Sequence, residues 1–122
     1  MRALLLAGVF AIAMPVALSV LADDQIDDAT RAAIFALATK GYKAPASATI
    51  RNIHKSKARN GLGYCGEVTV EGGDGYTEFH AILAGKDGTG ASVLRLADFP
   101  ATDTSNDAIA VRQMFVNFGC TE

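Results

Sequence analysis

Apolar and polar residues alternate in the middle of the chain, and this alternation predicts β-strands, because successive side chains of a strand point to opposite faces. Residues 48–54 alternate first, and residues 91–98 alternate again with Leu94 and Leu96 facing inward. Strict alternation divides the earlier strand into two faces: Ile50, Asn52 and His54 on one, and Thr49, Arg51 and Ile53 on the other. The two stretches are predicted to be the first and last strands of a sheet.

Residues 63–79 lie between these strands and predict a β-hairpin around which the rest of the fold is built. Glycine is concentrated in residues 72–75, which we expect to form a four-residue turn. The expected cross-strand pairs are then Val70 with Thr77, Val68 with Phe79, Glu67 with His80, and Cys65 with Ile82. In this register the valines and Phe79 face the core, whereas Glu67 and His80 lie side by side on the other face.

Two stretches repeat apolar residues at intervals of three and four, which predicts amphipathic helices. The first covers residues 27–40, opens with acidic residues and is followed by Gly41. The second covers residues 106–118, begins after a stretch rich in capping residues and ends at Gly119. The apolar positions are Ile26, Ala29, Ala33, Ile34, Leu37 and Ala38 in the first helix, and Ile109, Val111, Phe115 and Phe118 in the second. The predicted fold is an α+β domain, in which an antiparallel sheet of about four strands carries both helices on one face.

The first 22 residues have the composition of an export signal. A basic residue precedes an apolar run from residue 3 to residue 22, and small residues end the run. We expect cleavage after Ala22, so that residues 1–22 are a signal peptide, residues 23–122 form one domain, and the mature protein is periplasmic or secreted. The alternative is an uncleaved membrane anchor, since about 20 apolar residues can span a bilayer.

The chain has two cysteines, Cys65 and Cys120, and a short exported chain with two cysteines most simply forms one disulfide. The bond would close a loop of 55 residues, the difference between positions 120 and 65. In the chain-entropy model, closing a loop of that length stabilises the fold by about 4 kcal/mol. The alternative is a reactive or metal-binding pair of thiols. It is less favoured, because the chain has no Cys-x-x-Cys motif and no histidine close in sequence to either cysteine. The disulfide would attach the second helix to the hairpin.

Composition and charge limit the classes of partner. The 122 residues are 50% hydrophobic, which is enough for one core, and the formal net charge is −2. This near-neutral balance gives no argument for nucleic acid or an acidic lipid surface, because both favour a clustered excess of basic residues. No nucleotide-binding loop, metal-ligand cluster or cofactor motif is visible in the sequence, so no cofactor is expected. The partners considered are an envelope protein or a glycan.

The basic residues are most concentrated between residues 51 and 59. The candidate binding residues are Arg51, His54, Lys55, Lys57 and Arg59. They could contact an anionic glycan, a lipid phosphate or an acidic protein, although a solvated loop between two strands is the commoner meaning of such a run. Arg51 is also expected to form an ion pair with Glu67 or Glu78 on a neighbouring strand.

Glu67 and His80 are the candidate catalytic pair. A carboxylate beside an imidazole can act as base and acid in hydrolysis, or can hold a metal together with a third ligand. No recognised motif surrounds a nucleophile such as Ser92 or Thr69, and two histidines separated by a turn and a strand are a weak metal signature. A cross-strand polar pair is therefore the favoured interpretation of Glu67 and His80.

Three segments of the chain resemble a family of small uncharacterised bacterial and phage-associated exported proteins. The segments are Ala-Thr-Ile-Arg-Asn-Ile at 48–53, Tyr-Cys-Gly-Glu-Val at 64–68 and Gly-Tyr-Thr-Glu-Phe at 75–79, and a late cysteine follows an aromatic helix. Members of the family show Ser-Ala-x-Phe-Arg-Asn-Val, Val-Cys-Gly-Glu-Val-Asn and Gly-Gly-Tyr-x-Gly-Phe, so this chain differs at Ile50, Thr69 and Glu78. The resemblance covers most of residues 44–80, and it implies a shared architecture rather than a particular activity.

Export, small size, one disulfide and the lack of a convergent catalytic set favour a non-enzymatic module of the cell envelope that binds or inhibits a protein or a glycan. The exposed sheet face and the basic residues would form its contact surface. Two alternatives remain open. One is a small periplasmic hydrolase that uses Glu67 and His80, and the other is a purely structural envelope component.

Overall fold

The structure of the protein is a computed structural model that describes residues 25–121. The predicted signal peptide, residues 1–22, lies outside the described residues. The elements are, in chain order, α3 (Asp28–Ala38), the 3-10 turn η2 (Pro45–Ser47), β1 (Ile50–Lys55), β2 (Gly63–Thr69), β3 (Tyr76–Ile82), β4 (Ser92–Arg95), the 3-10 turn η3 (Leu96–Asp98) and α4 (Asn106–Asn117). The predicted helices and strands are all present, although the last strand gives way to η3 after Arg95. Among these elements, no helix is long and apolar enough to span a membrane.

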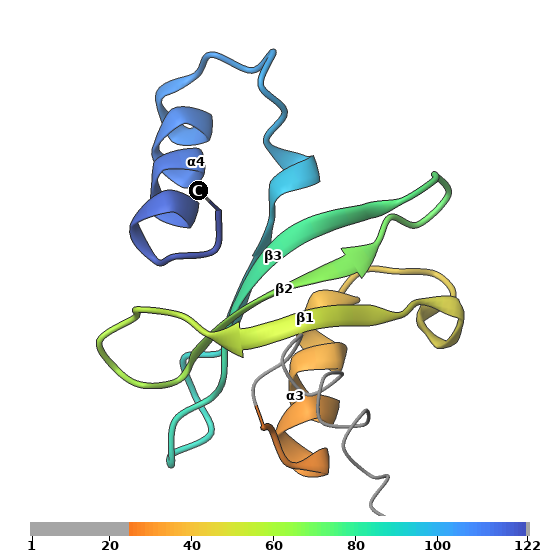
Figure 1. Ribbon diagram of the computed structural model, residues 1–122, viewed down its shortest axis with the longest axis vertical. Coiled ribbons are helices and arrows are strands. Elements are labelled where there is room, and N and C mark those ends of the chain that lie inside the picture. The colour runs from red at the N-terminus through yellow and green to blue at the C-terminus, as the bar shows by residue number, and fades with distance from the viewer. Residues whose placement is uncertain (1–24, 122) are drawn as a thin grey trace, which may run out of the picture.

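The four strands form one antiparallel sheet in the order β1-β2-β3-β4, so each strand pairs with its neighbour in sequence. Figure 1 shows the sheet as a twisted layer, with β2 and β3 in its middle. Antiparallel neighbours need only short connections, and successive strands of this sheet are joined by turns and loops. The chain is thus an α+β domain built on an antiparallel sheet, as predicted.

Helix α3 covers one face of the sheet and forms the main core with it. The helix begins after Asp27, whose carboxylate accepts a hydrogen bond of 2.7 Å from the backbone N–H of Thr30. The buried core consists of Ile34 and Ala38 of α3 together with Ile53, Val68, Phe79 and Ala81 of the strands. The alternation in sequence had placed Val68 and Phe79 on the core face, and that prediction is confirmed.

The prediction that both helices lie on one face of the sheet is wrong, because the end of α4 contacts the face opposite α3. Two neighbouring residues of β3 show this. Phe79 packs in the core with α3, whereas the ring of His80 stacks on Phe118, with centroids 4.6 Å apart. Successive side chains of a strand point to opposite faces, so the two helices are on opposite sides (Figure 1). An amphipathic pattern shows that a helix buries one side, but it does not show which face of a sheet receives that side.

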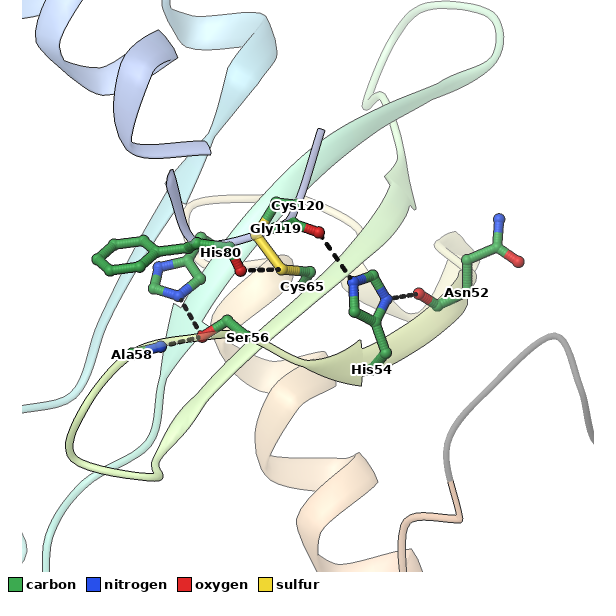
Figure 2. Close-up of a disulfide and its surroundings, with 9 residues drawn as sticks. Asn52, His54, Ser56, Ala58, Cys65, His80, Gly119 and Cys120 are labelled. Atoms are coloured by element: carbon green, nitrogen blue, oxygen red, sulfur yellow. Dashed lines mark hydrogen bonds between the residues drawn. A yellow bond between two sulfur atoms is a disulfide. The ribbon is translucent and has the colours of Figure 1, made fainter. Parts of the chain in front are cut away.

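The predicted disulfide attaches the C-terminal segment to the sheet. Cys65 of β2 is bonded to Cys120, with an S–S distance of 2.05 Å (Figure 2). Close to this bond, the backbone N–H of Lys57 donates a hydrogen bond of 3.0 Å to the carbonyl oxygen of Phe118. Both contacts involve residues that follow α4, so the helix is held to the sheet mainly through its C-terminal end.

The hairpin of β2 and β3 has a different register from the predicted one. Cys65 pairs with His80 and Glu67 pairs with Glu78, so each β2 residue lies opposite a β3 residue two positions earlier than expected. Residues 70–75 connect the strands, which is a longer connection than the four-residue turn predicted. A shift of two residues keeps every side chain on its predicted face, because the side-chain period of a strand is two. It does, however, separate Glu67 from His80.

Candidate functional site

A β-bulge in β1 determines which polar side chains share a face. The pairs on either side of the bulge are Arg51 with Glu67 and His54 with Cys65. Asn52 and Ile53 of β1 therefore lie opposite the single residue Gly66 of β2. The first of the two, Asn52, has a φ of +56°. Asparagine tolerates this left-handed conformation better than most residues do. As a result, His54 shares a face with Arg51, and Ile53 is buried in the core.

The predicted faces of the first strand are therefore wrong after Arg51. Strict alternation placed His54 on the same face as Ile50, but Ile50 packs against the core and His54 lies on the opposite side. The extra residue of the bulge reverses the alternation from that point on. The outward side chains of β1, β2 and β3 that result form what we call the polar face: Thr49, Arg51, Asn52, His54, Glu67, Tyr76 and Glu78.

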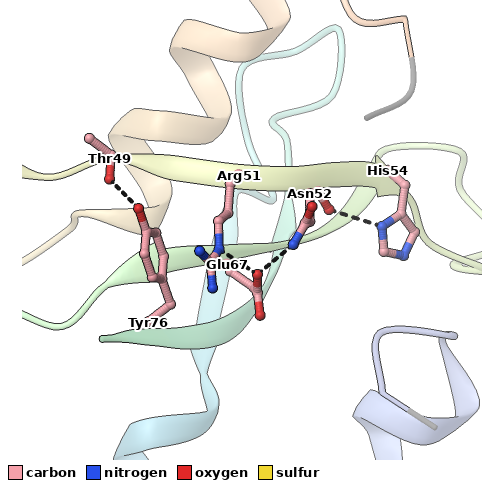
Figure 3. Close-up of polar contacts among 6 residues, drawn as sticks. All are labelled: Thr49, Arg51, Asn52, His54, Glu67 and Tyr76. Carbon is pink, nitrogen blue, oxygen red and sulfur yellow. Dashed lines mark hydrogen bonds and ion pairs between the residues drawn. The ribbon is translucent and has the colours of Figure 1, made fainter. Parts of the chain in front are cut away.

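Glu67 is the best-anchored side chain of the polar face (Figure 3). Its Oε1 accepts a hydrogen bond of 2.8 Å from Nε of Arg51 and one of 2.6 Å from Nδ2 of Asn52. The ion pair predicted for Arg51 is thus present. The Arg51 guanidinium also lies 3.6 Å from the ring centroid of Tyr76, whose hydroxyl is 2.9 Å from Oγ1 of Thr49. Glu67 and Arg51 are consequently held in one arrangement at the surface.

Glu78 lies directly opposite Glu67 in the register of β2 and β3. Partial burial raises the pKa of the Glu78 carboxyl, and the negative charge of Glu67 raises it further. Within residues 25–121 the Glu78 carboxylate has no hydrogen-bond or ion-pair partner. The Arg51 guanidinium, which is the nearest cation to Glu67, is engaged by Glu67 and Tyr76. Two carboxyl groups therefore face each other across β2 and β3, and Arg51 on β1 pairs with only one of them, Glu67.

A pocket of about 180 Å³ lies where the polar face meets the C-terminal segment. It is lined by Asn52, His54, Gly66, Glu67, Glu78 and Cys120. One ring nitrogen of His54 is 3.1 Å from the carbonyl oxygen of Asn52, and the other is 3.4 Å from that of Gly119 (Figure 2). His54 therefore connects β1 to the C-terminal segment, and the disulfide fixes the wall that Cys120 forms.

Four consecutive residues of β2 explain why the pocket lies at this position: Cys65, Gly66, Glu67 and Val68. Cys65 and Glu67 point to the polar side, where they supply the disulfide and the anchored carboxylate. Val68 is fully buried. The second of the four residues must be glycine, because a Cβ there would lie 2.5 Å from Cδ1 of Ile53 and 2.8 Å from Cζ of Phe79. The Cys-Gly-Glu-Val segment thus combines a covalent link, a tight core contact and a surface site.

His80, the other candidate catalytic residue, is not part of this pocket. It lies opposite Cys65, is 3% exposed, and stacks on Phe118. Its Nε2 is 2.9 Å from Oγ of Ser56, a contact that sequence reasoning missed because Ser56 lies in a polar loop with no motif (Figure 2). Burial lowers the pKa of the His80 imidazole. The expected side-by-side contact of Glu67 and His80 is absent, since the hairpin register differs by two residues.

The candidate basic residues do not gather on one surface. Arg51 and His54 belong to the polar face, whereas Lys55 pairs with a residue on the α3 side and donates from Nζ to the carbonyl oxygen of Gly61 (3.1 Å). The aliphatic chain of Lys57 lies beside the C-terminal segment, and Arg59 is exposed in the loop between β1 and β2. The basic run therefore divides into residues with separate surroundings.

The sequence did not indicate the roles of Asn52, Tyr76, Glu78 and Cys120 in this site, since it predicted Glu78 only as a possible partner of Arg51 and Cys120 only as a disulfide partner. Asn52 has a role because of the bulge, which a strictly alternating strand does not include, although the adjacent polar residues Arg51 and Asn52 interrupt the alternation at this point. Tyr76 and Cys120 reach the site through strand pairing and the disulfide, which are both long-range. No cluster of three or more histidine, cysteine or acidic residues suited to a metal ion occurs in the described part of the chain.

The fold and site together define a small disulfide-linked α+β domain with a polar sheet face and a pocket where that face meets the C-terminal segment. Comparison of the chain with protein-family models, with curated proteins and with solved structures gave no match.

Proposed function

We propose that the protein is a binding module of the cell envelope that recognises a protein partner through the polar face. The observation that carries this proposal is the stacked, ion-paired arrangement of Arg51, Tyr76 and Glu67 at an exposed surface. Arginine and tyrosine are enriched among the residues that dominate the binding energy of protein interfaces. Because these side chains are already held by one another, little rotamer freedom is lost when a partner covers them.

A protein is a better match to this face than a glycan. A sugar ring packs its C–H groups against an open aromatic ring, and Tyr76 is the aromatic residue of the polar face. The guanidinium of Arg51 lies 3.6 Å from the centroid of that ring and covers one of the two ring faces on which a sugar could stack. The hydrogen-bonding groups around the ring include charged, amide and hydroxyl groups, which occur in the polar rim of a protein interface.

The hydrolase alternative has less support from the geometry. Glu67 is ion-paired with Arg51 and accepts a hydrogen bond from Asn52, and His80 is buried between Ser56 and Phe118. A general acid and base must reach the same substrate, and these two groups are engaged in separate contacts. We therefore assign the polar face to binding.

We also propose that the protein is exported and that it shares its architecture with the small exported proteins that the Cys-Gly-Glu-Val segment at 65–68 resembles. The disulfide is compatible with an oxidising compartment, because such bonds are rare where thiols are kept reduced. Mass spectrometry of the protein recovered outside the cytoplasm should give a chain that begins at Asp23. A chain that retains the first 22 residues would contradict cleavage.

Site-specific photo-crosslinking tests the binding surface. We expect p-benzoylphenylalanine at Thr49, on the polar face, to crosslink a partner in an envelope extract of the producing cells. The same group at Ala33 should not, since Ala33 is exposed on α3 beside a separate apolar hollow of about 450 Å³ on the other side of the sheet. Unlabelled wild-type protein should compete, and an Arg51→Ala/Tyr76→Ala variant should compete about tenfold less well.

Crosslinking from Ala33 alone would place the interface on α3, and equal competition by the double variant would show that Arg51 and Tyr76 do not contribute. Either result would refute the proposed surface. Absence of crosslinks from both positions would favour the purely structural alternative.

A further inference from the structure

The polar face contains an imbalance of charge that suggests what a partner brings to it. Glu67 and Glu78 are directly opposite each other on adjacent antiparallel strands, a position in which like charges destabilise a sheet. Both side chains line the same pocket of about 180 Å³. The pocket therefore holds two carboxyl groups at close range in the free protein.

The hydrogen bonds of the site leave acceptors available. Arg51 and Asn52 both donate to Oε1 of Glu67, and neither donates to Glu78. Stacking on Tyr76 keeps the Arg51 guanidinium on the side of Glu67 away from the C-terminal segment (Figure 3). Glu78 has no donor among residues 25–121, so its carboxylate can accept hydrogen bonds from a ligand.

The size of the pocket suits the end of one side chain. Its walls come from β1, from β2 and β3, and from the disulfide-bonded Cys120. His54 reinforces the junction through its contacts with Asn52 and Gly119. A volume of about 180 Å³ admits a guanidinium or ammonium group with part of its alkyl chain, but not a folded element or a sugar chain.

We propose that this pocket receives the basic end of a side chain, a guanidinium or an ammonium group, presented by the protein that binds the polar face, with Glu78 as its counter-ion. The inference rests on the proposed function, because it assumes that the polar face contacts a protein. Charge complementarity supports it, since two carboxyl groups line the pocket and a charge-assisted hydrogen bond is about twice as strong as a neutral one.

The raised pKa of Glu78 supports the same occupant. Burial and the charge of Glu67 disfavour the ionised form of Glu78, and the opposite charge of a bound cation would favour that form and offset both effects. Binding should therefore weaken as the pH falls through the pKa of Glu78, which lies above the ordinary 4.5. It should also weaken with added salt, because a partly exposed ion pair is screened.

The test uses N-acetylarginine amide as probe and N-acetylcitrulline amide as its neutral isostere. We expect the arginine probe to shift the backbone NMR signals of Gly66, Glu67 and Glu78 in the whole domain, and the citrulline probe to leave them unchanged. N-acetyllysine amide provides the ammonium arm, so the two probes distinguish which cation fits better. Tighter binding of one probe identifies the partner's side chain as arginine or lysine. Equal binding of both probes supports a cationic group without distinguishing the two.

Two matched variants complete the experiment. Glu78→Gln should weaken binding of the arginine probe about fivefold, which corresponds to loss of a partly exposed charge pair. Asp74→Asn removes the same charge from the exposed turn between β2 and β3 and should leave binding unchanged. Equal shifts with arginine and citrulline, no shifts with either cation, or equal binding by wild type and Glu78→Gln would each overturn the inference.

The outcome can be separated from that of the proposed function. If the polar face captures a partner in the crosslinking experiment and Glu78→Gln captures it equally well, the interface stands and the cationic occupant is refuted. If the arginine probe binds in the pocket but crosslinks arise from Ala33 alone, the pocket is a cation site and the proposed protein interface is wrong.

Discussion

At the scale of single residues, Gly66 shows how closely the core and the site are joined. The residue lies between the disulfide cysteine and Glu67, and the space that its side chain would need is filled by Ile53 and Phe79. Both of those side chains are fully buried, so neither can move away without disturbing the core.

Gly66→Ala should therefore destabilise the domain by about 1–3 kcal/mol, the usual cost of forcing extra atoms into a packed core. Urea unfolding followed by circular dichroism measures the difference. Gly73→Ala is the matched control, because the nearest atom to a Cβ there is 3.3 Å away in a surface turn and Gly73 is not among the glycines with positive φ. If the two variants unfold at the same urea concentration, the packing argument for Gly66 fails.

Glu78 has an electrostatic cost that can be measured through pH. Its pKa is raised in the folded protein by burial and then by Glu67, so the ionised form opposes folding. The favourable contribution of the protonated form is present below the ordinary pKa of 4.5 and is lost as the pH rises through the folded pKa.

Glu78→Gln stays neutral at every pH, so we expect it to match the wild type in thermal stability at about pH 3.5 and to exceed it at pH 7. The gain should be less than about 1 kcal/mol, because the group is partly exposed. Thermal unfolding at the two pH values tests this. A difference between variant and wild type that is the same at both would show that the effect does not come from ionisation.

At the scale of elements, the bulge in β1 is the feature that the prediction of a regular strand missed. The sequence contained a sign of it, because the two consecutive polar residues Arg51 and Asn52 interrupt the alternation and place Ile50 and Ile53 three positions apart. Asparagine is compatible with a strand as well as with a positive φ, so its presence alone did not indicate a bulge. The sequence was sufficient for what depends on local spacing, such as the strands, the helices and the core positions of Val68 and Phe79. It was insufficient for the hairpin register, because the length of a glycine-rich turn is not set by its composition.

The conformation of Asn52 leads to an unusual order of stabilities. Alanine is ordinarily more stable than glycine within an element, because glycine loses more backbone freedom. At a φ of +56° the order should reverse, with Asn52→Ala less stable than Asn52→Gly by about 1 kcal/mol, since a Cβ is strained in the left-handed region.

Both substitutions remove the hydrogen bond to Glu67, so their difference isolates the backbone. Equilibrium unfolding in urea gives the comparison. If the alanine variant is the more stable of the two, the bulge does not hold residue 52 in this conformation.

At the scale of the whole molecule, the sheet separates two helices that are attached in different ways. Helix α3 belongs to the main core, whereas α4 is held by the Cys65–Cys120 bond, by the stack of Phe118 on His80 and by its own buried Phe115. The sequence contained a signal for this arrangement. Cys65 and Val68 are three positions apart in one strand and must face opposite sides, so a helix tied to the first cannot cover the second. The apolar pattern of α4 alone does not indicate which face of the sheet the helix contacts.

Reduction of the disulfide should therefore affect α4 before the sheet. The chain-entropy model gives a loss of about 4 kcal/mol for a loop of 55 residues, and we expect the loss to appear first as faster hydrogen exchange in α4. Exchange measured with and without a phosphine reductant, and in Cys120→Ser, tests this. Amides of β2 that lose protection together with those of α4 would show that the domain unfolds as one unit.

The alternation within β2 also has a consequence for how this chain can change over generations. A substitution in this strand alters only the face of the sheet to which that side chain points. The insertion or deletion of a single codon between residues 63 and 69 would instead turn the side chains beyond that point to the opposite face. The sulfur would then point toward the apolar interior and a valine toward water. Length variation in natural or laboratory-evolved versions should consequently be confined to the connections on either side of this strand, while the strand itself keeps seven residues.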